Sequence, residues 1–202
     1  AVNCHHISDL DAYLRAVDGI AELGANTLIV VTPMYQRKVD SSTIGFHRDR
    51  CPTDDQLVAI VDRGRSHGLF TIMMPIVLIE KPGKKDWRGL IEPDDWDAWW
   101  TSYDAMIDRF LGITERIDVD LLVVGSELNS TESQLDRWEH VVQRVRSRYD
   151  GLIAYSANWD RYAVARLWPL VDVMAVSSYF ELERDEDGAA EDELVAAWTP
   201  IR

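Results

Sequence analysis

Glu127 is the residue whose position most needs a chemical explanation. It follows the apolar run 121–124 and the small residues Gly125 and Ser126, so a carboxyl group stands where the chain leaves a buried segment. A buried Glu is costly unless it is paired or has a function. Its carboxyl group could act as a general acid and base, or it could form a structural ion pair with an arginine such as Arg88. The small residues before it would let the backbone lie close to a substrate.

Other polar and aromatic side chains stand at or just after the ends of the remaining apolar runs. Amides and acids bond sugar hydroxyl groups, and aromatic faces stack on sugar rings, so this set predicts a site for an oligosaccharide or polysaccharide. For the tryptophans, packing at the rim of the fold is the alternative. The predicted substrate-binding residues are Tyr35, Trp87, Arg88, Asn129, Asn158, Trp159 and Tyr179.

The distribution of histidines argues against a metal site. His5 and His6 form the one suggestive cluster, and no histidine follows the later apolar runs, where a metal-binding barrel would place further ligands. We therefore expect the pair to lie in a solvated loop, and we expect neither a metal nor a cofactor. A metal-dependent hydrolase stays as a further hypothesis, which bound zinc or manganese would reveal.

Charge and composition exclude several classes of partner. The net charge of −14 comes from acids spread along the chain, which disfavours nucleic acid and anionic membranes because both attract basic patches. No apolar run reaches the length needed to span a bilayer. A length of 202 residues with 47% hydrophobic content suits one sizeable core, so we predict a single domain over residues 1–202.

Strand-like apolar runs alternate with helical patterns along the whole chain. Continuous apolar runs separated by helices are typical of a parallel sheet that is covered on both faces. The predicted strands cover residues 27–35, 69–79, 120–126, 151–159 and 172–180. The predicted helices begin at Ser8, Thr53 and Pro93 and cover 131–148, 162–168 and 193–202.

The lengths of the loops favour a (β/α)8 (TIM) barrel over a doubly wound nucleotide-binding sheet. The loops 36–52 and 80–93 that follow strands are long, and barrels build their active sites from such loops. No glycine-rich phosphate loop follows any strand. The five strands correspond to strands two to six of a partial barrel, with the first strand expected before Ala1 and the last two beyond Arg202. The rest of a longer chain or self-association would supply the missing strands.

Cys4 and Cys51 each lie just upstream of a predicted helix start. A barrel could bring them together as a disulfide, and two free thiols are the alternative. The compartment therefore stays open, with secretion slightly favoured if the two cysteines are paired.

Long segments of the sequence resemble a known enzyme family. The segments "WRGLIEPDDWDAWWTSYDAMI", "DLLVVGSELNSTESQLDRWEHVVQRVRSRYDGLIAYSANWD" and "VDVMAVSSYF" look like the retaining β-mannanases of glycoside hydrolase family 113. The resemblance covers most of the chain and lies in order and spacing. It implies a (β/α)8 barrel that hydrolyses β-linked mannose polymers or related glycans without a cofactor.

The resemblance also implies roles for individual residues. The family's general acid/base falls on Glu127 in "GSEL", and its Trp-Arg-Gly loop falls on residues 87–89. Asn158 and Trp159 match the amide and aromatic residue after strand five, and Tyr179 matches the tyrosine of strand six. The family's nucleophile is a second Glu at the end of strand seven, which we expect beyond residue 202.

Two functions from different classes follow. The first is a retaining endo-β-mannanase-like glycoside hydrolase with Glu127 as its general acid/base. The alternative is a non-catalytic carbohydrate-binding or scaffold barrel that lacks the second carboxylate. The exact sugar stays open, because gluco- and manno-substrates differ at one hydroxyl group.

Overall fold

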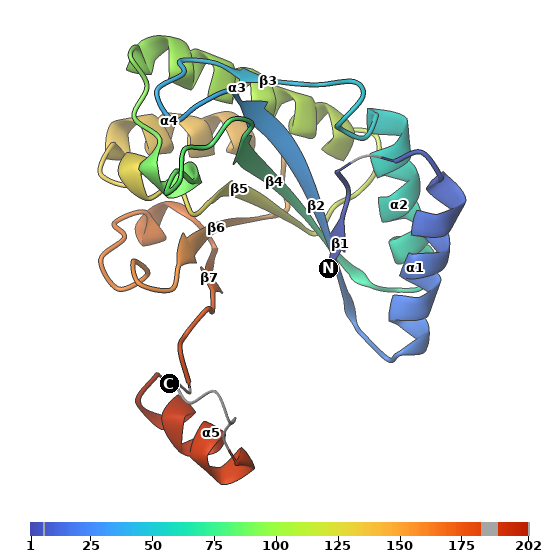
Figure 1. The fold of residues 1–202 in the computed structure, drawn as a ribbon. Helices are drawn as coiled ribbons and strands as arrows, with labels where there is room; N and C mark the ends of the chain where they lie inside the picture. The colour runs from blue at the N-terminus through green and yellow to red at the C-terminus, as the bar shows by residue number, and fades with distance from the viewer. Residues whose placement is uncertain (6, 183–189, 202) are drawn as a thin grey trace.

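One curved sheet organises the molecule. The computed structural model describes residues 1–5, 7–182 and 190–201. In these residues six parallel strands follow one another in chain order across the sheet, and the short strand β3 pairs antiparallel with β2 (Figure 1). This order is that of a (β/α)8 barrel, partial here because β1 and β7 do not pair within the described residues. The strands are β1 (Val2–Asn3), β2 (Thr27–Gln36), β3 (Ile44–Gly45), β4 (Phe70–Ile79), β5 (Leu121–Ser126), β6 (Leu152–Asn158) and β7 (Val173–Ser177).

The first strand of the barrel lies within the chain, so its expected position before Ala1 is wrong. Val2 pairs with Val30 and Asn3 with Val31 in the parallel register between β1 and β2. Two residues are too short to give an alternating pattern, which explains why the sequence alone did not reveal this strand.

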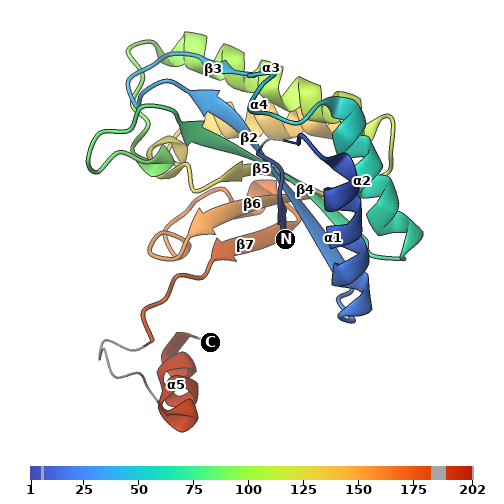
Figure 2. The same ribbon diagram turned by 45° about the vertical axis from the view of Figure 1, so that its right-hand side comes forward.

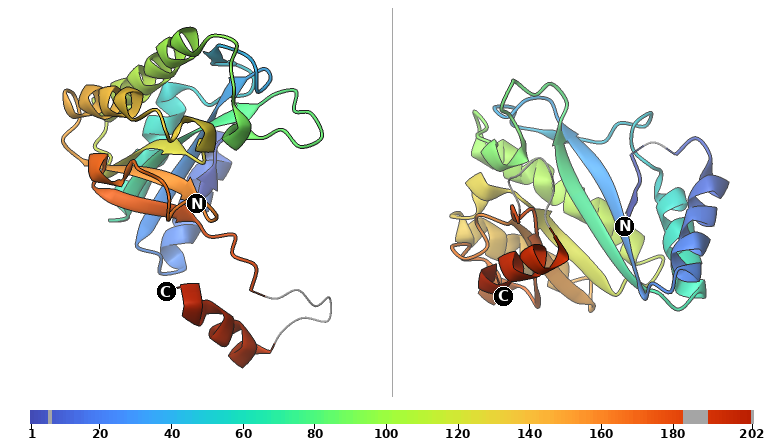
Figure 3. Two further views of the ribbon diagram at one scale, coloured as in Figure 1. Left: turned by 90° about the vertical axis from the view of Figure 1, so that its left-hand side faces the viewer. Right: turned by 60° about the horizontal axis from the view of Figure 1, so that its bottom comes forward.

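The helices α1 to α4 cover one face of the sheet (Figures 1 and 2). The opposite face is the interior of the barrel, where Leu121, Val123 and Ala154 form a separate small apolar cluster. The helices are α1 (Leu10–Glu22), α2 (Asp54–Ser66), α3 (Trp96–Thr114), α4 (Leu135–Arg146) and α5 (Glu191–Trp198), and the short 3-10 helices are η1 (Arg88–Leu90), η2 (Asn129–Thr131), η3 (Trp168–Leu170) and η4 (Thr199–Ile201). Helix α5 lies apart from α1 to α4 in the left-hand view of Figure 3.

The helix start predicted at Thr53 is correct, and the other predicted starts need correction. Helix α3 begins at Trp96 after its cap Asp95 rather than at Pro93, and α4 begins at Leu135 rather than at residue 131. The capping box of Thr53 and Gln56 is confirmed. Helix α1 is capped by Asp9, whose carboxylate accepts from the Ala12 N–H, rather than by Ser8. The helix predicted over 162–168 is wrong, since this segment forms turns and then η3. Pro169 explains the difference, because it has no N–H to donate to an α-helical carbonyl.

Aromatic rings fill the core between the sheet and the helices α3 and α4. Trp99 and Tyr103 stack at a centroid distance of 5.1 Å, and Tyr103 meets Trp138 edge-to-face at 5.6 Å. Trp138 meets Tyr155 of β6 at 5.2 Å. This continuous row lies directly behind the end of β5 and gives that strand end a rigid support.

Both cysteines are buried free thiols, so the disulfide alternative is wrong for this structure. The Cys51 thiol donates to the Pro33 carbonyl at 3.3 Å, and burial raises the pKa of Cys4 to about 12. Within the described residues, no helix has the length and apolar character needed to cross a membrane.

Candidate active site

Glu127 lies directly after β5, the fourth parallel strand of the sheet, with its side chain turned into the protein. The residue is only 7% exposed, and its N–H donates to the Ser156 carbonyl of β6 at 2.7 Å. Its φ of 54° makes it the one non-glycine residue with positive φ among those the structure describes. A left-handed conformation costs an L-residue about 1–2 kcal/mol, and such strain is concentrated at functional sites.

Arg88 of η1 is the partner of this carboxyl group. Its Nη2 donates to Glu127 Oε2 at 2.6 Å, and both side chains are largely buried. The bond is charge-assisted, so it fixes the position of the carboxyl group. Arg88 Nε is also buried but has no hydrogen-bond partner within the described residues. Such an unpaired buried donor is costly unless a ligand or water satisfies it.

Trp87 packs against the backbone of its own loop. A Cβ atom on Gly89 would lie 2.3–2.7 Å from three atoms of the indole ring, so only glycine fits there. The ring is half-buried in this position. Its stacking on a sugar therefore stays a prediction beside this observed packing role.

Asn129 lies on η2, two residues beyond Glu127, and lines an open cavity of about 600 Å³. Asn129 Oδ1 and Ser130 Oγ are buried without a hydrogen-bond partner among the described residues. Unpaired buried polar atoms are costly unless a ligand or water satisfies them. The other lining residues come from three loops, and half of them are charged: Val39, Asp86, Gly89, Leu90, Glu92 and Arg161.

The ring of Tyr35, near the end of β2, is covered by other side chains of the protein. Arg50 lies over its ring at 3.9 Å from the centroid, and His47 meets the ring edge-to-face at 5.4 Å. Arg50 also donates to Glu80 at the end of β4 at 2.5 Å. Sequence reasoning missed Arg50 and His47, whose positions in a long loop give no periodic signal. The role of Tyr35 in substrate binding stays a prediction.

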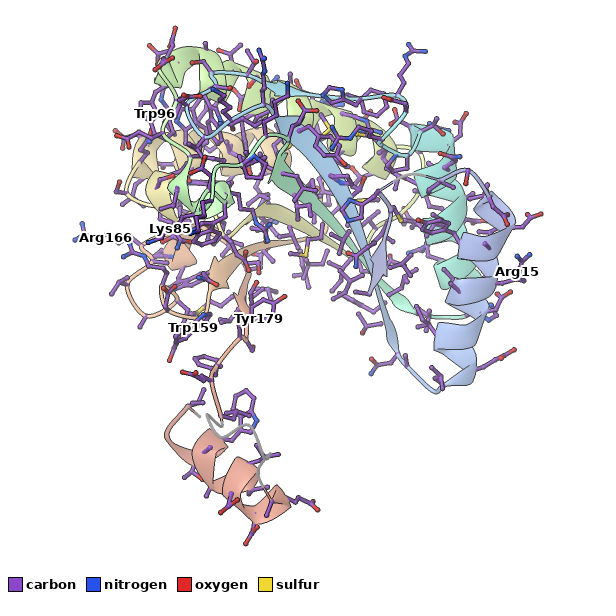
Figure 4. All side chains as sticks on the ribbon, viewed as in Figure 1. Arg15, Lys85, Trp96, Trp159, Arg166 and Tyr179 are labelled. Atoms are coloured by element: carbon purple, nitrogen blue, oxygen red, sulfur yellow. The ribbon has the colours of Figure 1, made fainter. Side chains whose placement is uncertain are left out.

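Asn158, Trp159 and Tyr179 lie toward the open side of the sheet. Asn158 Nδ2 donates to Asp160 Oδ1 at 2.8 Å, and Trp159 meets Phe180 edge-to-face at 5.8 Å. Tyr179 is 77% exposed, and Figure 4 shows it with Trp159 near the segment that leads to α5. The structure therefore joins Arg88 to the Glu127 carboxyl group and places Asn129 two residues further along the same loop. It leaves Trp159 and Tyr179 on the exposed rim.

Sequence reasoning also missed Glu132 and Tyr155. Glu132 is 3% exposed, and its Oε1 accepts from the Tyr155 hydroxyl at 3.0 Å. Burial raises the pKa of Glu132, against the opposing effect of the Tyr155 hydrogen bond and the Arg161 charge. Burial together with the neighbouring Glu132 keeps the pKa of Tyr155 well above its usual value.

The described residues contain no group of three or more His, Cys, Asp or Glu that could hold a metal ion. His6 of the predicted histidine pair lies outside the described residues.

The strand order and the buried carboxyl group at the end of the fourth parallel strand place the chain among (β/α)8-barrel proteins. The sequence model of Glycoside Hydrolase Family 113 matches residues 11–198. The chain therefore belongs to Glycoside Hydrolase Family 113. A comparison with curated proteins finds no match.

Solved structures agree with this family and fold. A GH113 β-mannanase from Alicyclobacillus acidocaldarius, in complex with ManMIm, has a TM-score of 0.79 and 24% identity over 91% of this chain. A GH113 β-1,4-mannanase has a TM-score of 0.77 and 25% identity over 86% of this chain. An exo-β-1,4-mannosidase from Opitutaceae bacterium strain TAV5 has a TM-score of 0.55 and 12% identity over 87% of this chain and 37% of its own length. The chain spans 61% and 57% of the lengths of the first two.

Proposed function

We propose that the protein is a retaining glycoside hydrolase that cleaves β-linked mannan or a related β-glycan, with Glu127 as its general acid/base. The observation that carries the proposal is the buried carboxyl group at the C-terminal end of the fourth parallel strand of a family 113 chain. The cavity lined by Asn129, which also carries the charged residues Asp86, Glu92 and Arg161, supports a ligand that offers hydroxyl groups for hydrogen bonding.

The proposed chemistry uses two carboxyl groups about 5–5.5 Å apart. A second Glu, expected beyond residue 202, attacks the anomeric carbon. Glu127 donates its proton to the glycosidic oxygen as the leaving group departs, and then deprotonates the incoming water. Arg88 holds the carboxyl group at the site through its 2.6 Å bond to Oε2.

Substrate binding is proposed for the strand-end residues predicted from the sequence. Asn129 and Asn158 would bond sugar hydroxyl groups, Trp87 and Trp159 would stack on sugar rings, and Tyr179 would bond the nucleophile. Tyr35 lies beneath Arg50, so it would reach a sugar only through its edge. No cofactor takes part in this chemistry.

Glu127→Gln in the full-length protein tests the proposal. The amide cannot transfer a proton, so we expect hydrolysis of β-1,4-mannan to fall by about 10²–10⁴-fold. Binding of mannotetraose, measured by calorimetry, should stay nearly unchanged. Glu139→Gln, an exposed residue of α4, is the matched control and should retain activity.

Changing the leaving group of the substrate tests the role of Glu127 as an acid more directly. An aryl mannoside with an acidic phenol needs little proton donation, so its first turnover should be far less affected by Glu127→Gln than turnover of mannan. Proton NMR of the first product should show the β-anomer, as retention requires. Full activity of the Gln variant on mannan would remove Glu127 from the mechanism.

The Arg88–Glu127 ion pair favours one competing function, a non-catalytic carbohydrate-binding barrel, because the pair already satisfies the carboxyl group. In that case the unsubstituted full-length protein would bind mannotetraose without hydrolysing it. Measurable mannan hydrolysis would exclude this function.

A further inference from the structure

The left-handed turn at Glu127 needs support, because a single residue at positive φ relaxes unless its surroundings fix it. The N–H of Glu127 is held by the Ser156 carbonyl at 2.7 Å. The next N–H, that of Leu128, donates to the Tyr155 hydroxyl at 3.2 Å. The N–H groups of both peptide units that flank the Cα atom of Glu127 are therefore bonded to β6.

The Tyr155 hydroxyl is itself fixed by Glu132. It accepts from Leu128 and donates to Glu132 Oε1 at 3.0 Å, so both functions of the hydroxyl are used. Tyr155 is fully buried and Glu132 is 3% exposed. Water therefore has little access to either hydrogen bond and cannot readily replace one of its partners. Arg161 approaches the other carboxyl oxygen of Glu132 at 3.8 Å from the loop after β6.

The Leu128 carbonyl is held as firmly as its N–H. It accepts from the Thr131 N–H at 2.9 Å and from the Thr131 hydroxyl at 2.7 Å. The Thr131 carbonyl in turn accepts from the Trp138 indole at 3.0 Å. The N–H and the carbonyl of Leu128 are thus both held by buried side chains, those of Tyr155 and Thr131.

We propose that Tyr155 and Glu132 are positioning residues, which hold the Leu128 amide and so fix the direction of the Glu127 carboxyl group. This role rests on the proposed function of Glu127 as the acid/base, since positioning affects turnover only if that carboxyl group transfers a proton. A misplacement of about 1 Å costs a catalytic group about 10²-fold in rate.

The role of Glu132 requires only an acceptor for the Tyr155 hydroxyl. Both the ionised and the protonated carboxyl group can accept this hydrogen bond at Oε1. Gln at this position keeps an acceptor oxygen, whereas Leu removes it.

Tyr155→Phe in the full-length protein is the principal test. We expect kcat on mannotetraose to fall by about 10–100-fold with KM changed less than about twofold, because geometry and not binding is lost. The Leu128 amide should also exchange with solvent faster by hydrogen-exchange mass spectrometry or NMR. Tyr149→Phe is the matched control: its buried hydroxyl donates to the Val119 carbonyl at 2.8 Å, at the opposite end of β5. Tyr149→Phe should change neither kcat nor the exchange rate of the Leu128 amide.

Variants of Glu132 test the same role if the Tyr155→Phe protein does not fold. Glu132→Gln should retain kcat within about threefold, and Glu132→Leu should lose about tenfold and expose the Leu128 amide to exchange. If Tyr155→Phe and Glu132→Leu keep both kcat and Leu128 protection, the positioning role is wrong. If Glu127→Gln is fully active, the proposed function has failed instead, and the Leu128 exchange rates still decide whether Tyr155 and Glu132 hold the turn.

Discussion

At the scale of the residue, the conformation of Glu127 predicts a measurable strain. With φ at 54°, an alanine at this position carries the same left-handed penalty, whereas glycine does not. We expect Glu127→Gly to be more stable than Glu127→Ala by about 1 kcal/mol, although glycine loses more backbone entropy on folding. Urea denaturation of the two variants measures the difference. A more stable Ala variant would mean that the turn is not strained.

The sequence predicted those residues of the candidate site whose place depends only on where a strand ends along the chain. Glu127 and Arg88 were identified because one ends an apolar run and the other lies in a strand-to-helix loop, and the structure joins them at 2.6 Å. Tyr155 and Glu132 were not, because their contact depends on which face of β6 the tyrosine occupies. That face is set by tertiary packing, and an apolar strand gives no alternation from which to read it.

At the scale of the element, the packing of the end of β5 against the aromatic core depends on Gly125. The sequence suggested that this glycine gives a substrate access, but the space belongs to the aromatic core. A Cβ atom there would lie 2.6 Å from Trp138 and 2.9 Å from Tyr155. Both rings are fully buried, so neither can move aside freely.

Gly125→Ala should therefore destabilise the protein by about 1–3 kcal/mol, since overpacking displaces rings that support the Glu127 turn. Gly112→Ala in α3 is the control, because a Cβ atom there meets nothing within 4 Å among the described residues. It should stabilise the helix by about 0.5–1 kcal/mol. Thermal unfolding of both variants measures the contrast. Equal effects would show that Trp138 and Tyr155 adapt to the added methyl group.

Elements were predictable where a local rule decides them. The strands and the cap at Thr53 follow from apolar runs and from a capping box. The helix predicted over 162–168 was wrong because the segment forms turns and then η3, which contains Pro169. Strand β1 was not predicted, because its two residues give no local pattern and its pairing with β2 is a long-range contact.

At the scale of the whole molecule, the sheet of residues 1–202 has unpaired strands at both ends within the described residues. Its inner face carries an apolar cavity of about 280 Å³, lined by residues that include Ile72, Met74 and Val123. A closed barrel fills this interior with side chains from all its strands. The prediction that more chain or a second copy supplies the missing strands remains open.

These features predict that the 202-residue chain, produced alone, self-associates through the β7 edge. An open edge offers unpaired N–H and C=O groups, and Met174 on β7 is 55% exposed. The net charge of −14 opposes association, so association should strengthen as salt shortens the Debye length from about 30 Å at 0.01 M to about 8 Å at 0.15 M. Sedimentation velocity over a range of protein concentrations at both salt levels measures this. Met174→Lys should weaken association, whereas Leu23→Lys, which changes an apolar and even more exposed residue at the C-terminal end of α1, should not. A monomer under all these conditions would show that the open sheet is stable without a partner.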